Sequence, residues 1–155
     1  MEITIPTVLK SFSSAGAAIT GFASWLKRAK GDSRALIAEL KDNLSYLDMV
    51  VEDGVALGNV IEKISVSEFK RLSKAGFNFN TLKRSNIDNY PSLSGTDLAS
   101  WGGKETETLI FSIYEKINDL LIRYPHVANN KNYRWNIRVN NIRKRIWLLL
   151  KHVNS

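Results

Sequence analysis

Residues 135–153 read WNIRVNNIRKRIWLLLKHV, and this stretch decides the fold class. Its apolar residues recur at alternating four- and three-residue steps, a spacing that places them on one face of an α-helix. The sequence therefore predicts a helix from about Asn132 to His152 with one face directed at a hydrophobic core. The residues of that face are Trp135, Val139, Ile142, Ile146, Leu149 and Val153.

The segments before this stretch also carry helical patterns, and glycine or proline marks their expected ends. The predicted helices run from Thr4 or Thr7 to about Lys30, from a cap at Asp32 or Ser33 to Val51 (and on to Ile64 if Gly54 and Gly58 only kink the helix), from Ser65 or Ser67 to Gly76, and from about Lys104 to Tyr124, where Pro125 ends it. No strand-type alternation of comparable length occurs. We therefore expect an all-α bundle of four to five helices.

A long irregular segment, residues 77–103, comes before the fourth predicted helix. Asn, Ser, Gly and Pro residues, which are typical of turns, are frequent in it. It also carries apolar side chains, which predict that it packs against the helices as an ordered excursion. One short helix is expected within it, at Thr96–Trp101.

The composition is typical of one cytoplasmic domain, residues 1–155. The chain has 155 residues, of which 44% are hydrophobic, and this is enough for one core. It has no cysteine, so neither disulfides nor thiolate metal sites can hold it together. The longest uncharged stretch, Ser11–Leu26, is shorter than the ~20 apolar residues that a membrane-spanning helix needs.

Positive charge is concentrated near the end of the sequence. Residues 1–119 hold 14 Lys and Arg against 15 Asp and Glu, whereas residues 120–155 hold eight bases and no acid, so the net charge is +7. This asymmetry is typical of proteins that bind nucleic acid, a membrane surface or an acidic protein, although a solvated helix face gives the same pattern. The eight bases are Arg123, Lys131, Arg134, Arg138, Arg143, Lys144, Arg145 and Lys151.

Helix geometry brings several of these bases to one edge of the last helix. At about 100° per residue, Lys131, Arg134, Arg138, Asn141, Arg145 and His152 fall within roughly 80° of one another, beside the apolar face. Arginines one and two turns apart can contact successive phosphates, and an exposed Trp147 beside them would stack on a base. The competing interpretation is that Trp147 packs under residues 77–103. The predicted nucleic-acid-binding residues are Lys131, Arg134, Arg138, Lys144, Arg145 and Trp147.

Arg145 and His152 are separated by six residues on one side of this helix. The spacing resembles the Arg-x4–6-His motif of HEPN-type helical ribonucleases, although those proteins usually have a polar residue where this chain has Ile146. The resemblance implies metal-independent RNA cleavage. In that reaction His152 would move the 2′-hydroxyl proton and Arg145 would stabilise the charged phosphorane, so these two are the candidate catalytic residues.

Small residues dominate the first predicted helix, with Ala15-Gly16-Ala17-Ala18 at its centre, and a basic junction and an amphipathic helix follow. In this respect the first 60 residues resemble the HeLo-like helical bundles of cell-death proteins. The resemblance implies a membrane-active cell-death or defence domain in which residues 7–30 contact the bilayer. Close packing of small residues between helices is the competing explanation.

Other patterns exclude several function classes. With two histidines and no cysteine, no metal site is expected. Gly103-Lys104 is followed by Glu105 instead of Ser or Thr, so a phosphate-cradling loop is absent and no cofactor is expected. We therefore expect a non-catalytic binding or assembly module that uses the basic helix. Its partner would be nucleic acid or an acidic protein surface, with RNA favoured over duplex DNA because no helix-turn-helix spacing is present.

Overall fold

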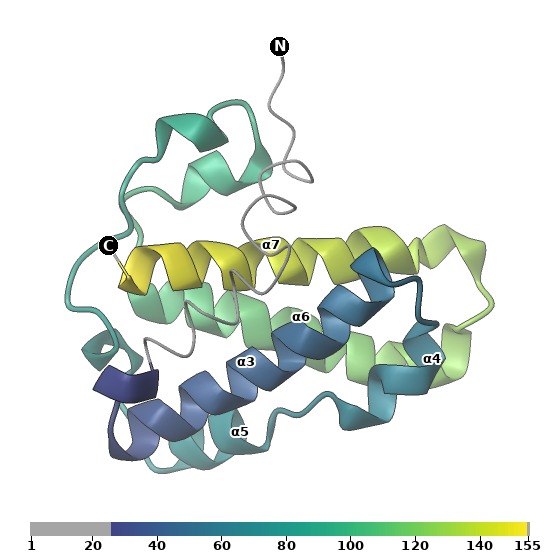
Figure 1. Ribbon diagram of the computed structural model, residues 1–155, viewed down its shortest axis with the longest axis horizontal. Helices are drawn as coiled ribbons and strands as arrows, with labels where there is room; N and C mark the ends of the chain where they lie inside the picture. Colours follow the sequence, from purple (N-terminus) through teal and green to yellow (C-terminus); the bar gives the residue numbers. More distant parts are fainter. Residues whose placement is uncertain (1–25, 155) are drawn as a thin grey trace.

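The computed structural model describes residues 26–154, and every regular element among them is helical (Figure 1). The α-helices are α3 (Gly31–Glu52), α4 (Leu57–Val60), α5 (Ser67–Lys74), α6 (Thr106–Val127) and α7 (Trp135–Val153). The 3₁₀ helices are η2 (Ile61–Lys63), η3 (Phe79–Thr81), η4 (Pro91–Leu93), η5 (Asp97–Trp101) and η6 (Lys131–Tyr133). The predicted all-α bundle of four to five helices is therefore confirmed. Most of the predicted first helix lies outside the described residues, and residues 26–28 are helical.

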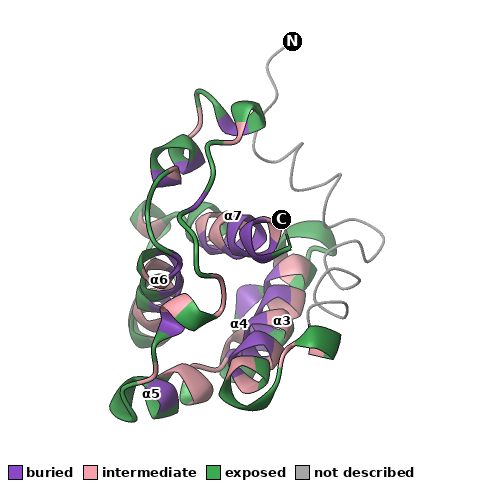
Figure 2. Ribbon diagram, turned by 90° about the vertical axis from the view of Figure 1, so that its left-hand side faces the viewer, coloured by how far each residue is buried: buried purple, intermediate pink, exposed green. Residues whose placement is uncertain are grey.

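α7 lies at the centre of the bundle. It packs against both α3 and α6, and all three helices carry buried residues (Figure 2). Trp135 is partly buried, and the other five residues of the predicted apolar face are fully buried. Burial of each such aliphatic side chain contributes roughly 1.5–3 kcal/mol to stability. The predicted core-facing stripe of α7 is thus confirmed.

Two glycines follow helix ends, Gly54 after α3 and Gly76 after α5. Gly54 has a φ of +69°, in the left-handed region that favours glycine, and α3 ends just before it at Glu52. The extension of this helix towards Ile64 is therefore wrong, because the chain turns at Gly54 and starts the separate helix α4. Gly76, with a φ of +72°, closes α5 as predicted.

The predicted cap of α3 is wrong. Its N-cap is Lys30, which makes no side-chain capping hydrogen bond. Asp32, one of the two predicted caps, lies inside the first turn and forms an ion pair of 3.0 Å with Arg71 of α5. A carboxylate in the first turn still interacts favourably with the positive end of the helix dipole. Asp32 was therefore correctly predicted to lie near the start of the helix, but it does not cap it.

Pro125 does not end the fourth predicted helix, because α6 continues to Val127. Proline fits the helical φ and removes one backbone hydrogen bond, which a well-packed final turn can tolerate. That turn is held by Trp135, whose indole Nε1 donates to the carbonyl of Ala128 at 3.1 Å. The Trp135 ring also packs edge-to-face on Tyr124, with 5.3 Å between ring centroids. Tertiary contacts therefore stabilise the end of α6 beyond the proline.

Residues 77–103 form the packed excursion that the sequence predicts. The segment contains η3, η4 and η5, and η5 matches the short helix expected at Thr96–Trp101. η3 packs on α6 and η5 packs on α7. Two backbone hydrogen bonds join Ile87, within the segment, to its C-terminal end, from Ile87 N to Lys104 O at 2.8 Å and from Gly103 N to Ile87 O at 2.7 Å. Its buried apolar side chains are Phe79, Ile87, Leu93, Leu98 and Trp101.

Candidate functional site

Five of the eight bases in residues 120–155 form ion pairs, and Arg143 is the most buried of these. Its side chain is 2% exposed and binds two carboxylates of α3, those of Asp48 and Glu52, the latter at 2.7 Å. Burial raises the pKa of the Asp48 carboxyl, and the Arg143 guanidinium opposes that rise. Arg143 therefore joins α7 to α3 inside the protein.

Lys144 and Arg145 share a single carboxylate on the excursion. Asp97 of η5 lies 3.0 Å from the Lys144 ammonium and 3.8 Å from the Arg145 guanidinium. Arg145 also donates to the Asn141 carbonyl at 3.0 Å, and its side chain is only 13% exposed. The expectation that Arg145 continues an exposed arginine edge is therefore wrong, because η5 packs over this part of α7.

Trp147 is buried at 3% exposure, so it presents no open ring face for a base. Its predicted role as an exposed stacking residue is wrong, and the competing interpretation of packing fits better. The Lys151 ammonium lies 5.9 Å from the Trp147 ring and 5.0 Å from the ring of Tyr90, a residue of the excursion. Residues 77–103 thus cover an edge of α7 that a projection of this helix alone would place in solvent.

His152 is also buried, at 1% exposure. Its Nε2 hydrogen bonds with the hydroxyl of Thr106 on α6 at 2.8 Å. Burial, together with the charge of Lys83, lowers the pKa of His152 below its ordinary value and favours the neutral ring. A proton shuttle must reach the 2′-hydroxyl of an RNA, and this ring is enclosed by the protein. The catalytic pair expected from the ribonuclease resemblance, Arg145 and His152, therefore does not fit this geometry.

Lys131 and Arg134 remain at the surface at the start of α7. Both are exposed, and neither forms an ion pair with any residue from 26 to 154. Arg134 has a φ of +46°, the left-handed conformation that L residues other than glycine and asparagine rarely adopt. These two side chains are the part of the predicted basic edge that is both exposed and without an ion pair to the described residues.

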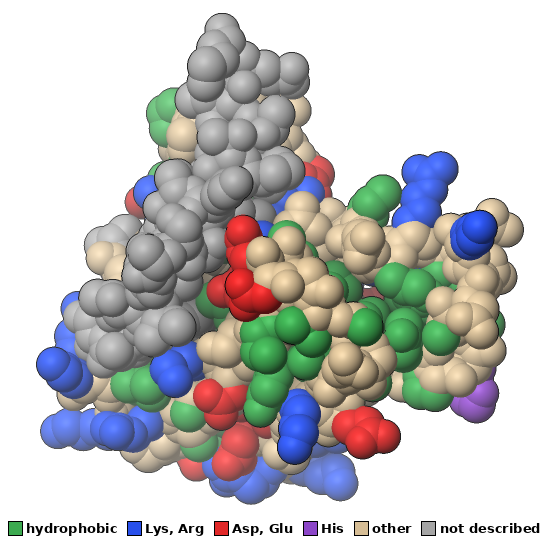
Figure 3. All heavy atoms as spheres, turned by 45° about the vertical axis from the view of Figure 1, so that its right-hand side comes forward, with side chains coloured by type: hydrophobic (Ala, Val, Ile, Leu, Met, Phe, Trp, Pro, Cys, Tyr) green, Lys and Arg blue, Asp and Glu red, His purple; other side chains and the backbone are tan. Residues whose placement is uncertain are grey.

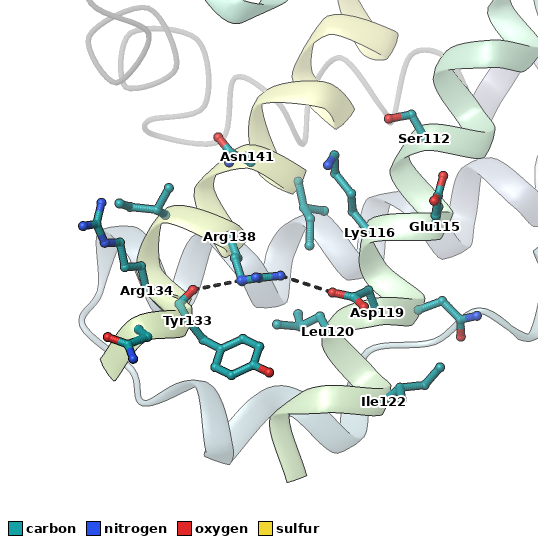
Figure 4. Close-up of a pocket in the computed structure, with 14 residues that line it drawn as sticks. Ser112, Glu115, Lys116, Asp119, Leu120, Ile122, Tyr133, Arg134, Arg138 and Asn141 are labelled. Atoms are coloured by element: carbon teal, nitrogen blue, oxygen red, sulfur yellow. Dashed lines mark hydrogen bonds and ion pairs between the residues drawn. The ribbon is translucent and has the colours of Figure 1, made fainter. Parts of the chain in front are cut away.

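A groove of about 820 Å³ lies between α6 and α7 beside these bases (Figure 4). Figure 4 shows Arg138 reaching across it from α7 towards Asp119 of α6. Arg134 lines the groove at the start of α7, and Ile122 of α6 lies at its far edge. The groove is lined by both signs of charge and by apolar side chains: Glu115, Lys116, Asp119, Leu120, Ile122, Tyr133, Arg134, Ile137, Arg138 and Ile142.

Tyr133 adds an aromatic surface to the groove. Its ring stacks on Trp135, with centroids 5.1 Å apart and planes 8° apart. The Arg138 guanidinium lies 5.1 Å from the Tyr133 ring centroid. Tyr133 was not among the predicted binding residues, although the alternation of basic and aromatic residues in Lys131-Asn132-Tyr133-Arg134-Trp135 was a signal for it. We call Lys131, Tyr133 and Arg134 the α7-start face; Arg138, which is paired with Asp119, lies beside it.

Exposed apolar side chains accompany this face. Ile122 is 62% exposed and Ile137 is 53% exposed, and both line the groove. Figure 3, a view of one face of the molecule, shows hydrophobic side chains in its middle and on its right, with Lys and Arg side chains projecting at the edges. Contiguous apolar surface beside charge is typical of a binding surface.

Among residues 26–154 no helix is long and apolar enough to cross a membrane. The same residues contain no cluster of three or more His, Asp or Glu side chains that could hold a metal ion. The membrane contact expected for residues 7–30 falls mostly outside the described part of the chain. Comparisons with protein-family models, curated proteins and solved structures found no match.

Proposed function

We propose that this protein is a non-catalytic binding module that engages single-stranded RNA through the α7-start face. The observation that carries the proposal is the exposure of Lys131 and Arg134, without ion pairs to described residues, beside the stacked ring of Tyr133. Lys and Arg side chains that contact phosphates supply most of the sequence-independent affinity for nucleic acid. Aromatic rings next to them stack on unpaired bases.

The backbone at Arg134 supports a role for this residue in binding. A φ of +46° costs a non-glycine residue roughly 1 kcal/mol, and such strain is concentrated at functional sites. Glycine would fit this position without strain but would remove the charge. An arginine held in this conformation at the surface is consistent with a side chain that is needed for binding.

The groove favours a flexible single strand over a duplex. Its carboxylates, Glu115 and Asp119, repel phosphates, so a strand would keep its backbone on the exposed bases outside. Unpaired bases could then contact Tyr133 and Ile137 at the groove edge. A duplex has no unpaired bases to offer, and its second backbone would lie near the carboxylates.

Charge reversal with a matched control tests the proposal. Lys131→Glu with Arg134→Glu should lower the affinity for a labelled single-stranded RNA of about twelve nucleotides by tenfold or more, measured by fluorescence anisotropy at low salt. The control is Lys70→Glu with Lys74→Glu, two exposed bases of α5 whose reversal changes the net charge equally. Equal affinity in the two double variants would show that binding is not localised at α7 and would sink the proposal.

A simpler observation separates RNA from an acidic protein partner. If nucleic acid is the partner, the purified wild-type protein should carry it at low salt, which raises the ultraviolet absorbance ratio, and nuclease treatment should lower that ratio. A protein that purifies free of nucleic acid and does not bind the labelled RNA would favour an acidic protein surface instead.

A further inference from the structure

Asp119 of α6 holds two arginines with one carboxylate. Its Oδ1 accepts from Arg123 Nε at 2.6 Å, and its Oδ2 lies 3.2 Å from Arg138 Nη1. Asp119 is 40% exposed, and the two arginines are 50% and 43% exposed. Both ion pairs are therefore at the surface, within reach of a phosphate that binds nearby.

Arg138 also contacts Tyr133. Its Nε donates to the Tyr133 carbonyl at 2.8 Å, and its guanidinium lies over the Tyr133 ring. Figure 4 shows the side chain extended across the groove from the Tyr133 carbonyl to Asp119. Arg138 is thus held at both ends of its guanidinium, in contrast to Arg134, which is exposed and forms no ion pair with the described residues.

We infer that Asp119 limits the affinity of the α7-start face for RNA by withholding Arg138 and Arg123 from phosphate contact. This inference rests on the proposed function, because it concerns the same face and the same ligand. A phosphate that approaches Arg138 must displace the carboxylate and is repelled by its charge. Exposed ion pairs are weak, so neutralising Asp119 should free both guanidiniums without unfolding the helices.

A double-mutant cycle tests the inference. Asp119→Asn, nearly identical in shape to the native residue, should raise affinity for the single-stranded RNA about fivefold at low salt. The slope of log K against log salt should become more negative by about 0.7 for each further phosphate that the freed arginines bind. Arg138→Gln alone should change affinity less than about twofold, because Arg138 is already neutralised. Combined with Asp119→Asn, the same change should remove at least half of the increase in affinity, leaving the part that comes from Arg123.

Two controls keep the result interpretable. Glu115→Gln removes a charge from the same groove at a residue that forms no ion pair with the described residues. It should therefore raise the affinity for RNA less than Asp119→Asn does. Adding Arg138→Gln to Glu115→Gln should not change the affinity further. Asp119→Ser is measured alongside Asp119→Asn, and circular dichroism confirms the fold of each.

The inference is overturned if the wild type binds RNA and neither Asp119 variant binds more tightly. It is also overturned if Arg138→Gln weakens binding equally with and without the Asp119 charge. Failure of the wild type to bind RNA at all would instead defeat the proposed function.

Discussion

Replacing Glu39 with alanine should destabilise the protein by about 3 kcal/mol, because this α3 residue caps another helix. Glu39 is 7% exposed. Its Oε2 accepts from Glu68 N at 2.8 Å, and its Oε1 accepts from Phe69 N at 3.3 Å. Those are backbone donors in the first turn of α5, whose own N-cap, Val66, supplies no side-chain hydrogen bond.

The magnitude follows from these contacts. Loss of an N-cap costs about 1 kcal/mol, and a hydrogen bond to a charged group contributes roughly 1.5–3 kcal/mol. The same carboxylate also accepts from the hydroxyls of Ser65 at 3.1 Å and Ser67 at 3.2 Å. These contributions are not additive, because they share two oxygens, so about 3 kcal/mol is the expected total.

Urea unfolding followed by circular dichroism measures the effect. With a slope of about 2 kcal/mol per M, the midpoint should fall by about 1.5 M. Asp42→Ala is the control, because this α3 carboxylate is 68% exposed and its nearest cation, Lys41, is 3.9 Å away. It should shift stability by less than about 0.5 kcal/mol. A Glu39→Ala midpoint as close to the wild type as that of the control would refute the capping role.

Three further predictions concern other parts of the structure and are checked by urea unfolding. Arg134→Gly should be more stable than Arg134→Ala by about 1 kcal/mol, because only glycine relieves the positive φ; equal stabilities would argue against strain. Arg143→Met should cost about 3 kcal/mol at neutral pH, because it leaves the Asp48 and Glu52 carboxylates without their cation; a neutral effect would contradict this. His152 has a lowered pKa, so its contribution is present above its ordinary pKa of 6.5 and is lost as the pH falls through the folded value. Wild-type stability should therefore fall between about pH 7 and 5 more than that of His152→Gln, and parallel profiles would disprove the assignment.

The helices were predictable because their signals are local. The apolar spacing of α7 depends on residues at three- and four-residue steps, and the same helix buries them. Gly76 closes α5 because its left-handed backbone conformation suits glycine. Such signals need no knowledge of the rest of the fold.

The ion pairs of the basic residues were not predictable, because most of the acidic partners are distant in sequence. Arg143 is paired across 95 residues with Asp48, and Lys144 across 47 residues with Asp97. A count along the chain records eight unbalanced bases, whereas the folded chain brings acids from α3, η5 and α6 to five of them. A linear charge asymmetry therefore overstates the basic surface.

A helical projection of α7 alone does not show which of its edges is exposed to solvent. Trp147 and Ile137 both lie off the predicted core face, yet Trp147 is buried and Ile137 is 53% exposed. The difference arises from residues 77–103, which pack against one end of α7 and leave its start uncovered. The position of that excursion is a tertiary property that the periodicity of one helix does not contain.

The most direct test of the RNA-binding proposal is the salt dependence of wild-type binding to single-stranded RNA, measured by fluorescence anisotropy. Two phosphate contacts, by Lys131 and Arg134, predict a slope of about −1.4 in log K against log salt. The Lys131→Glu, Arg134→Glu double variant should lose this binding. Absence of binding at low salt, or an affinity and slope that the double variant leaves unchanged, would contradict the proposal.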